Sequence, residues 1–497
     1  MQDINIQLPS ILDQVIQSIP AFKAELALIF AFLGSILATL FLDKIWKQSS
    51  FVITIIGIVA SLILSTQQLG APQNGFFGML IIDDFSVYAR GIIQVALLIC
   101  VIFIQQHFHH KKFSKNLGDV YSILLAAALG MNILTMTSNW LLAFIAIETV
   151  SISSYILVGY FSENKKQSEA SMKYVLFGSV SAAVMLYGLS LIYGFTGNLD
   201  FTSFEHIQGL IEAPKILLSI ALLFMFVGIG FKLSFVPFHM WAPDVYEGAP
   251  TPITTFLSTV PKIGALVLLA RLFEEWTSTS FFFSELVLVL VSVAAIVTML
   301  AGNLIALRQS NIKRMMAYSS IGHTGFLLMA LVGNLASEPQ VLLFYIAVYT
   351  IMNLAVFGLI DILEQKTGSA QLENYQGLGK QFPILFSILT LLGISLVGLP
   401  PTAGFVGKLF VFTSIFDLFQ FNNNRYYLIL LVVGALTSVI SLFYYFKIPL
   451  FAFLRKGNEI KILPTTSTQI VYITAILLGV STLVLGIFPS ILLSLFR

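Results

Sequence analysis

Fourteen separate apolar runs, each long enough or nearly long enough to cross a bilayer, constrain this chain more than any other feature. A membrane-spanning helix needs about 20 predominantly apolar residues. The runs lie at about 22–42, 51–66, 79–105, 120–137, 139–160, 174–195, 216–239, 251–272, 284–306, 315–333, 340–363, 383–418, 426–450 and 468–496. Because 57% of the 497 residues are hydrophobic and only 10% are charged, we expect one polytopic, all-α membrane domain over residues 1–497 in a lipid bilayer.

Charge and cysteine content exclude several other classes of protein. The net charge is +2 and the basic residues are scattered among short loops, so we expect no nucleic-acid partner. A single cysteine, Cys100, excludes an internal disulfide framework. The sequence has no glycine-rich phosphate loop, no cysteine cluster and no pair of span histidines at haem-ligand spacing, so we predict no cofactor or metal in this chain. The polar amino terminus lacks the basic start of a signal peptide, and we expect no cleaved targeting segment.

Two of the runs contain residues that break helices. The run at 383–418 is too long for one straight span and contains LPPTAG at 399–404, and the run at 216–239 contains Pro237, five residues after Lys232. Proline removes a backbone donor, and carbonyls freed at membrane depth must be shielded from lipid. We therefore predict broken helices in the seventh and twelfth spans, irregular from Lys232 to Pro237 and from Gly398 to Gly404.

Lysine and arginine are unevenly divided between alternate loops. Sixteen of the 26 basic residues lie in loops that follow odd-numbered spans, and five lie in the other loops and the termini. Cytoplasmic loops carry such an excess. We therefore predict that the odd-numbered loops face the cytoplasm and that both termini face away from it. Five basic residues remain inside spans: Arg90, Lys173, Lys232, Lys262 and Lys408.

Ionisable side chains within the apolar runs are the strongest functional signal. Lys232 is the only charged residue from 216 to 235, and Glu148, Lys262 and Lys408 lie similarly inside spans. A central lysine costs roughly 3 kcal/mol, so the set would cost on the order of 10 kcal/mol if unpaired and dry. Such residues usually mark a path for ions or protons, and a desolvated lysine can accept and release protons. These four residues are candidate relay groups.

Three further residues each have a structural alternative. Lys173 follows Glu169 by four residues, so an interfacial ion pair and a role in proton transfer are both open. His323 is either a satisfied interior histidine or a relay group. Arg90 lies shortly after two aspartates at the mouth of its span, where we favour an anchoring role.

The spacing of the candidate residues indicates an internal repeat. Glu148 precedes Lys232 by 84 residues and His323 precedes Lys408 by 85, so the two halves are offset by about 175 residues, or five spans. An odd number of spans reverses the direction in which the second unit enters the membrane, as in the inverted repeats of many transporters. We predict five-helix units at 120–272 (spans 4–8) and 284–450 (spans 9–13).

Several motifs resemble one known family. They are GFKLSFVPFHMWAPDVYEGAPTP at 230–252, followed by Pro261 and Lys262; EASMKY at 169–174; YGLSLIYG at 187–194; NIKRMMAYSSIGH at 311–323; and GLPPTAGFVGK at 398–408. They closely resemble the subunit N family of proton-translocating NADH-quinone oxidoreductase, respiratory complex I. The resemblance runs from about 75 to 450. Related cation/proton antiporter subunits share the lysine and Leu-Pro-Pro pattern, but the stretch from Trp241 to Pro252 resembles subunit N.

The resemblance implies fourteen spans, two inverted five-helix units and a proton channel along the middle of the membrane. By motif, Glu148 matches the channel glutamate, Lys232 the broken-helix lysine, Lys262 the central relay lysine and Lys408 the exit-side lysine. It further implies that other subunits hold NADH, FMN, iron-sulfur clusters and quinone, and that this chain contacts other membrane subunits and, through them, the peripheral redox arm. The expected location is the bacterial inner membrane or an equivalent energy-coupling membrane, with either NADH or ferredoxin as electron donor.

Two other classes of function remain as alternatives. A free-standing monovalent cation/proton antiporter would need a self-sufficient ion site, and a purely structural subunit would only pair its buried charges. Co-purification with redox subunits would favour a subunit of complex I over a free-standing antiporter. Loss of pumping when the lysines are neutralised would exclude a purely structural subunit.

Overall fold

The structure, a computed structural model, describes residues 2–42, 45–108, 116–161, 164–278, 281–333, 339–456 and 469–496. In this part of the chain, 14 helices are long and apolar enough to cross a membrane, as predicted. The named secondary-structure elements of the described residues are helical apart from one short hairpin, in which β1 pairs antiparallel with β2. The prediction of an all-α, multi-pass membrane protein is therefore confirmed.

The first half of the chain runs through eleven α-helices. Their bounds, with the hairpin and the short helical turns, are α1 Gln2–Ser18, η1 Ile19–Phe22, α2 Lys23–Leu37, η2 Ala38–Leu42, α3 Ser49–Thr66, β1 Gln73–Gly75, β2 Leu80–Ile82, α4 Asp84–Phe108, α5 Leu117–Met136, α6 Trp140–Gly159, α7 Lys165–Thr196, α8 Phe204–Glu212, α9 Lys215–Leu233, α10 Trp241–Gly248 and α11 Thr251–Thr277.

The second half continues the bundle. Its elements are α12 Phe282–Ala306, α13 Ile312–Gly333, α14 Gln340–Thr367, η3 Leu372–Tyr375, η4 Leu378–Lys380, α15 Pro383–Val397, α16 Ala403–Asn422, α17 Arg425–Tyr445, α18 Lys447–Pro449, η5 Leu450–Leu454, α19 Gln469–Ile487, α20 Ser490–Leu493 and η6 Ser494–Phe496.

Asparagine side chains begin several of the spans. Asn116, Asn139, Asn164 and Asn424 each occupy an N-cap position with extended backbone, and each side chain accepts a hydrogen bond from an amide in the first turn. These bonds satisfy donors that have no partner inside the helix. The local sequence therefore sets where the helices begin.

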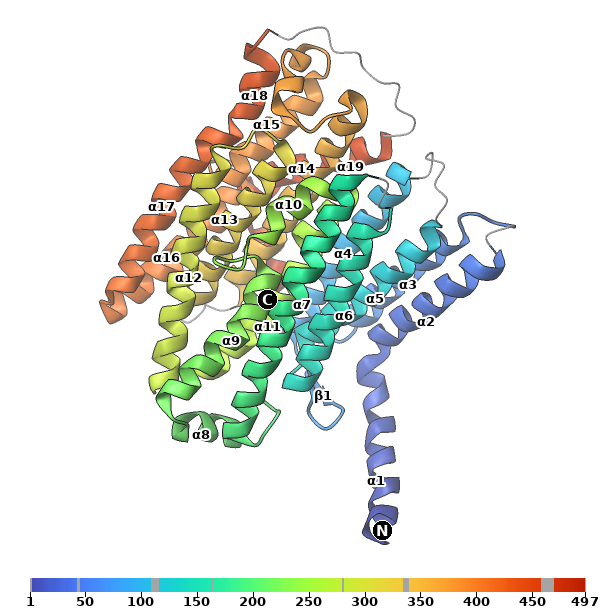
Figure 1. The fold of residues 1–497 in the computed structure, drawn as a ribbon, viewed down its shortest axis with the longest axis vertical. Helices are drawn as coiled ribbons and strands as arrows, with labels where there is room; N and C mark the ends of the chain where they lie inside the picture. Colours follow the sequence, from blue (N-terminus) through green and yellow to red (C-terminus); the bar gives the residue numbers. More distant parts are fainter. Residues whose placement is uncertain are drawn as a thin grey trace.

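Three helices form the enclosed centre of the molecule. Along its most apolar stretch α11 is 100% buried, and α13 and α14 are each 94% buried, whereas α19 is only 22% buried. Outer helices such as α17 and α19 expose large Leu, Ile, Val and Phe side chains, which suits contact with lipid. In Figure 1, α8 and β1 lie at one end of the bundle, α18 lies at the opposite end, and α1 extends away from the body.

The amino-terminal part differs from the prediction at two places. The first span extends back to Ile11, where a polar amino terminus was expected to precede it. Leu80–Ile82 forms β2 of the hairpin, although its apolar residues had been assigned to the third span. The third span itself begins at Asp84, whose position in the first turn suits the positive end of the helix dipole.

Candidate functional site

The predicted break in the seventh span lies directly after Lys232. Helix α9 ends at Leu233, and Ser234 has a left-handed conformation with φ of 61°. Protein groups satisfy carbonyls freed by the break: the Trp241 indole donates to the Phe231 carbonyl at 2.9 Å, and the Thr324 hydroxyl donates to the Leu233 carbonyl at 3.0 Å. The prediction of an irregular, shielded backbone here is confirmed.

The second break places two backbone carbonyls against Lys408. Helix α15 ends at Val397, Gly398 has φ of 89°, and α16 begins at Ala403, so this prediction is also confirmed. The Lys408 ammonium donates to the Leu396 carbonyl at 3.1 Å and to the Val397 carbonyl at 2.8 Å. These carbonyls belong to the negative end of the α15 dipole, which favours a cation.

Lys232 contacts the helix of Glu148 through a serine. The Lys232 ammonium donates to the Ser151 hydroxyl at 3.0 Å, and Ser151 lies three residues after Glu148 on the same face of α6. The Lys232 side chain is buried and Glu148 is half-buried. No ion pair within 4.0 Å joins the two residues, both of which lie in described helices.

Lys262 is held by hydroxyl groups at the centre of the bundle. Its ammonium donates to the Ser320 hydroxyl at 2.7 Å, the Thr324 hydroxyl at 3.0 Å and the Ser320 carbonyl at 3.4 Å. Only 2% of Lys262 is exposed. Since Thr324 also contacts the Leu233 carbonyl, one hydroxyl joins Lys262 to the broken end of α9.

His323 lies on the same helix as the partners of Lys262 and contacts two tyrosines. Its Nδ1 is 2.9 Å from the Tyr345 hydroxyl and its Nε2 is 3.3 Å from the Tyr445 hydroxyl. One turn further along α13, the Phe326 ring centroid lies 4.3 Å from the Lys408 ammonium. Helix α13 therefore carries contacts to both Lys262 and Lys408.

Lys173 lies apart from this buried row. Its side chain is 39% exposed and pairs with Glu169 at 2.7 Å, the ion pair that the sequence offered as one of two alternatives, and with Asp244 at 2.8 Å. Asp244 also pairs with Arg314 at 2.5 Å, which ties α7, α10 and α13 together. Burial alone would raise the pKa of Asp244, but the hydrogen bonds from Lys173 and Arg314 hold that pKa below its usual value.

The prediction that Arg90 anchors the mouth of its span is wrong, because Arg90 lies in the interior of the bundle. It is completely buried, pairs with Glu25 at 3.1 Å and donates to the Gln68 amide oxygen at 2.8 Å. The nearby Asp83 pairs instead with Arg271 at 2.6 Å. Glu25 was not singled out from the sequence because 65 residues separate it from its partner.

The neutral partners of the lysines were also missed. Ser151, Ser320 and Thr324 are ordinary span residues by composition, although Ser320 and Thr324 are separated by four residues and so share a face of α13. In the described ranges, no group of three or more His, Cys, Asp or Glu side chains is placed to hold a metal ion.

The bundle, its two broken helices and its row of buried lysines define the class of antiporter-like membrane proteins. The family model "NADH:quinone oxidoreductase/Mrp antiporter, TM" matches residues 137–441, which include the six predicted site residues Glu148, Lys173, Lys232, Lys262, His323 and Lys408. The chain belongs to the NADH-quinone oxidoreductase subunit N family.

Two curated relatives and one solved structure illustrate this similarity. The chain is 38% identical over 450 residues to NADH-quinone oxidoreductase subunit N 2 of Chloroherpeton thalassium, covering 88% of this chain and 86% of the relative. It is 35% identical over 462 residues to NADH-quinone oxidoreductase subunit N of Chlorobium chlorochromatii, covering 90% and 88%. A chain of respiratory complex I from Thermus thermophilus with bound aureothin has the same fold, with a TM-score of 0.77 and 29% identity over 94% of this chain and 98% of that one.

Proposed function

We propose that this chain translocates protons across the membrane as an antiporter-like subunit of an NADH-quinone oxidoreductase complex. Glu148, Lys232, Lys262, His323 and Lys408 form its relay, and quinone reduction on other subunits drives it. The relatives named as subunit N support the assembly. The observation that carries the proton pathway is that the buried lysines Lys232, Lys262 and Lys408 bond to hydroxyl and carbonyl groups and form no ion pair within 4.0 Å in the described residues.

A structural role for the buried charges would favour direct ion pairs, whereas the hydrogen-bond partners of the relay lysines are neutral groups. In the part of the chain that the structure describes, no carboxylate lies within 4.0 Å of the Lys232, Lys262 or Lys408 ammonium. Arg90 shows the contrasting arrangement, because a glutamate and a glutamine satisfy it directly. A buried amine without a fixed counter-ion is costly to keep charged. It is therefore suited to gaining and losing a proton.

The side chains between the relay groups favour transfer along the membrane plane. Thr324 joins Lys262 to the end of the α9 helix that carries Lys232. Gaps longer than a hydrogen bond need intervening water. A cavity of about 10 Å³ beside Lys262, lined by Thr259, Tyr349 and four apolar side chains, is at the lower limit of the volume that one water molecule requires.

The positions of the breaks support the proposed inverted repeat. With units at 120–272 and 284–450, each break falls in the fourth span of its unit, in α9–α10 and in α15–α16. Each unit then contributes one lysine next to irregular backbone, Lys232 or Lys408. In transporters of this architecture, broken helices at the repeat interface bind the transported ion.

Substitutions at Lys262 test the pathway. Lys262→Met approximately keeps the apolar stem and removes the amine, whereas Lys262→Arg keeps a charge that does not leave at any accessible pH. Both variants should assemble into the complex and pump protons more slowly in inverted vesicles, while the exposed Lys380→Met control pumps normally. A structural cation would instead tolerate arginine. Normal proton-to-electron stoichiometry with normal turnover in both Lys262 variants would remove Lys262 from the path.

Mild-detergent purification tests the assembly. We expect the chain to co-purify with other membrane subunits and with the soluble redox subunits. Recovery as a free-standing protein that exchanges monovalent cations for protons would favour the antiporter alternative.

A further inference from the structure

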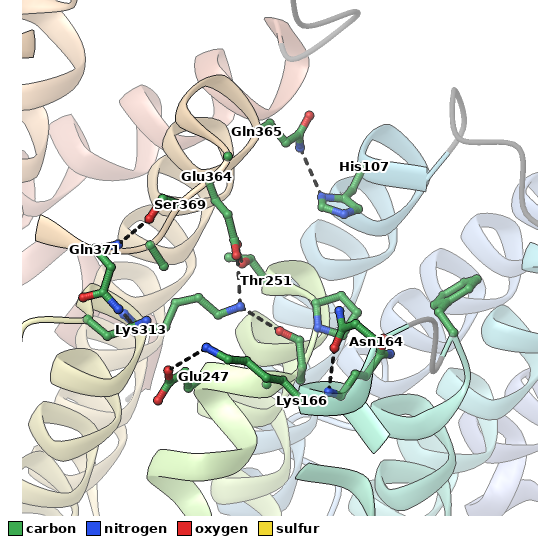
Figure 2. Close-up of a pocket in the computed structure, with 18 of the residues that line it drawn as sticks. His107, Asn164, Lys166, Glu247, Thr251, Lys313, Glu364, Gln365, Ser369 and Gln371 are labelled. Atoms are coloured by element: carbon green, nitrogen blue, oxygen red, sulfur yellow. Dashed lines mark hydrogen bonds and ion pairs between the residues drawn. The ribbon is translucent and has the colours of Figure 1, made fainter. Parts of the chain in front are cut away.

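A large pocket opens at the end of the bundle that carries the predicted cytoplasmic loops. Its volume is about 490 Å³, and its walls come from the ends of α4 and α14, the start of α7, the turn from α10 to α11 and the start of α13 (Figure 2). Each of these segments adjoins a loop that follows an odd-numbered span. We refer to this pocket as the vestibule.

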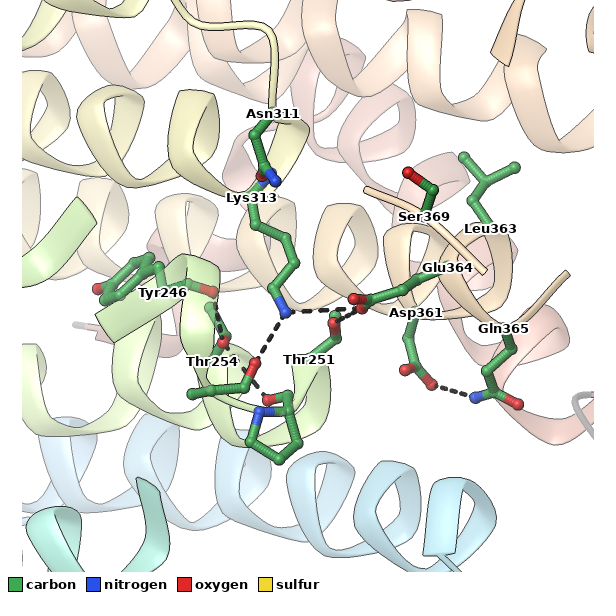
Figure 3. Close-up of polar contacts among 12 residues, drawn as sticks. Tyr246, Thr251, Thr254, Asn311, Lys313, Asp361, Leu363, Glu364, Gln365 and Ser369 are labelled. Carbon is green, nitrogen blue, oxygen red and sulfur yellow. Dashed lines mark hydrogen bonds and ion pairs between the residues drawn. The ribbon is translucent and has the colours of Figure 1, made fainter. Parts of the chain in front are cut away.

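An ion pair forms part of the wall of the vestibule. Lys313 is only 3% exposed, and its ammonium lies 3.6 Å from a Glu364 carboxylate oxygen and donates to the Ala249 carbonyl at 2.7 Å. The Thr251 hydroxyl donates to the same carboxylate oxygen of Glu364 (Figure 3). The Glu364 side chain keeps 33% of its surface exposed. The carboxylate therefore contacts both solvent and the buried interior.

Helix stability does not explain the position of Lys313. It lies in the first turn of α13, where the positive end of the helix dipole disfavours a cation. Its side chain is buried instead of extending into water, and its ammonium is bound to Glu364 and the Ala249 carbonyl. The position suits a group that orients the neighbouring carboxylate of Glu364.

Hydroxyl side chains continue from this pair towards Lys262. On α11, Thr251, Thr255, Ser258 and Lys262 follow one another at intervals of four, three and four residues, which places them along one face of the helix. All four are buried. Eleven residues of helix correspond to about 16 Å, so this face reaches from the vestibule to the relay.

The neighbouring central helices add polar groups along the same route. On α14, the Tyr349 hydroxyl donates to the Ser258 carbonyl at 3.1 Å and lies 2.7 Å from the Ser320 hydroxyl, which itself binds Lys262. On α13, Ser320 lies seven residues, or two turns, after Lys313 and therefore on the same face. Polar groups from three enclosed helices converge on Lys262 from the direction of the vestibule.

We infer that the vestibule is an entrance through which protons from the cytoplasm reach Lys262, with Glu364 as the first acceptor and Lys313 as its positioning residue. This inference rests on the proposed function. A proton from water binds the Glu364 carboxylate and weakens its ion pair, while Lys313 keeps the Ala249 carbonyl as a partner. The proton then leaves Glu364 through water beside Thr251 and Thr255, and the ion pair forms again. The route does not pass through Glu148 or Lys232.

A substitution of matched shape tests Glu364. Glu364→Gln keeps the size and removes the proton acceptor, so we expect quinone-linked pumping in inverted vesicles to fall by at least about tenfold, since positioned proton carriers commonly contribute 10²–10⁴-fold. The control is Glu373→Gln, an exposed carboxylate on η3 outside the vestibule. Lys313→Met should lower pumping in the same direction. Normal pumping by an assembled complex with Glu364→Gln would contradict the proposal that protons enter through Glu364.

A labelling experiment tests the same idea after the complex has folded. Ser369→Cys places a thiol in the vestibule, and the native Cys100 is fully buried. A bulky, membrane-impermeant thiol reagent added to inverted vesicles should label Ser369→Cys and slow pumping severalfold. The controls are labelled Glu373→Cys and wild-type complex treated in the same way. Failure of the reagent to label the Ser369→Cys thiol would contradict the proposal that the vestibule opens to the cytoplasm. Pumping by the labelled complex at the unlabelled rate would contradict the proposal that protons enter through the vestibule.

Lys262→Met measured in parallel separates the two proposals. If Lys262→Met pumps normally, the relay itself is wrong. If Lys262→Met is impaired while Glu364→Gln and labelled Ser369→Cys pump normally, only the entrance is wrong.

Discussion

Thr324 bonds both to Lys262 and to the broken end of α9. Its hydroxyl accepts from the Lys262 ammonium at 3.0 Å and has one hydrogen to give, with the Leu233 and Ser320 carbonyls both 3.0 Å away. A rotation of this hydroxyl exchanges one acceptor for the other. The central lysine and the broken helix are therefore joined by a group that has two equivalent arrangements.

We predict that Thr324→Val lowers pumping while the complex still assembles. Valine keeps the shape but removes an acceptor from Lys262, and losing a hydrogen bond to a charged group costs about 1.5–3 kcal/mol. Thr324→Ser retains the hydroxyl and should restore most of the rate. The measurement is proton pumping per electron in vesicles, and equal rates for the valine and serine variants would contradict the prediction.

We predict that Gly398→Ala destabilises the second break. Gly398 has φ of 89°, and a Cβ there would approach the Lys408 Cδ to 2.8 Å. Left-handed backbone alone costs a residue other than glycine about 1–2 kcal/mol. The unfolding temperature of the purified complex should fall, whereas Gly194→Ala, in an open helical position of α7, should leave it unchanged. Similar behaviour of the two variants would show that the break tolerates a side chain.

We predict that Arg90→Leu affects assembly and not the path of protons. It would leave the carboxylate of Glu25 buried without its cation, which typically costs about 3–5 kcal/mol. The double variant Glu25→Leu with Arg90→Leu should recover part of the loss. The yield of assembled complex reports stability, and stoichiometry per electron should remain normal in the complex that forms. A changed stoichiometry would place this pair on the pathway.

We predict that Asp244 stabilises the protein in a pH-dependent way. Its pKa is lower in the folded state, because hydrogen bonds from Lys173 and Arg314 outweigh the effect of burial. The contribution is therefore fully present above the unfolded pKa of about 3.9. It is lost as pH falls through the folded pKa. Unfolding temperatures of wild type and Asp244→Asn should differ by a constant amount from pH 8 to about pH 5 and converge in stronger acid; a gap that widens in acid would contradict this.

We predict opposite accessibility for two surface positions. Glu205 on α8 follows the sixth span, and Lys456 follows the thirteenth. An impermeant thiol reagent should label Lys456→Cys from the cytoplasmic side and Glu205→Cys from the opposite side. The reverse pattern would invert the proposed orientation of the chain and of both termini.

Local chemistry explains why the breaks could be predicted from the sequence. Proline removes a backbone donor, and the two breaks lie next to Pro237 and within the Leu399-Pro400-Pro401 segment, as predicted. The burial of Lys232, Lys262 and Lys408 likewise follows from the long apolar runs around them.

Partners distant in the chain could not be predicted in the same way. The Glu25–Arg90 pair joins α2 to α4, two helices whose relative placement in the bundle no local pattern specifies. Ser320 and Thr324 were missed because hydroxyl residues occur in many spans and usually bond to their own helix backbone. Residues 80–82 were assigned to a helix because three consecutive apolar residues are too few to show either the helical or the strand spacing of apolar residues. They were therefore joined to the neighbouring span.

The protonation state of Lys408 determines how many hydrogen bonds its side chain donates and how strong they are. An ammonium has three hydrogens, and Lys408 has three acceptors, the Leu396 and Val397 carbonyls and the Ser438 hydroxyl at 3.3 Å. Loss of a proton removes one hydrogen and the positive charge, so the remaining bonds from Lys408 are weaker and Ser438 keeps its contact only by donating to the amine nitrogen. Two of the three acceptors are the terminal carbonyls of α15, while Lys408 itself belongs to α16. Charge on this one nitrogen therefore sets how firmly the two half-helices are fastened to each other.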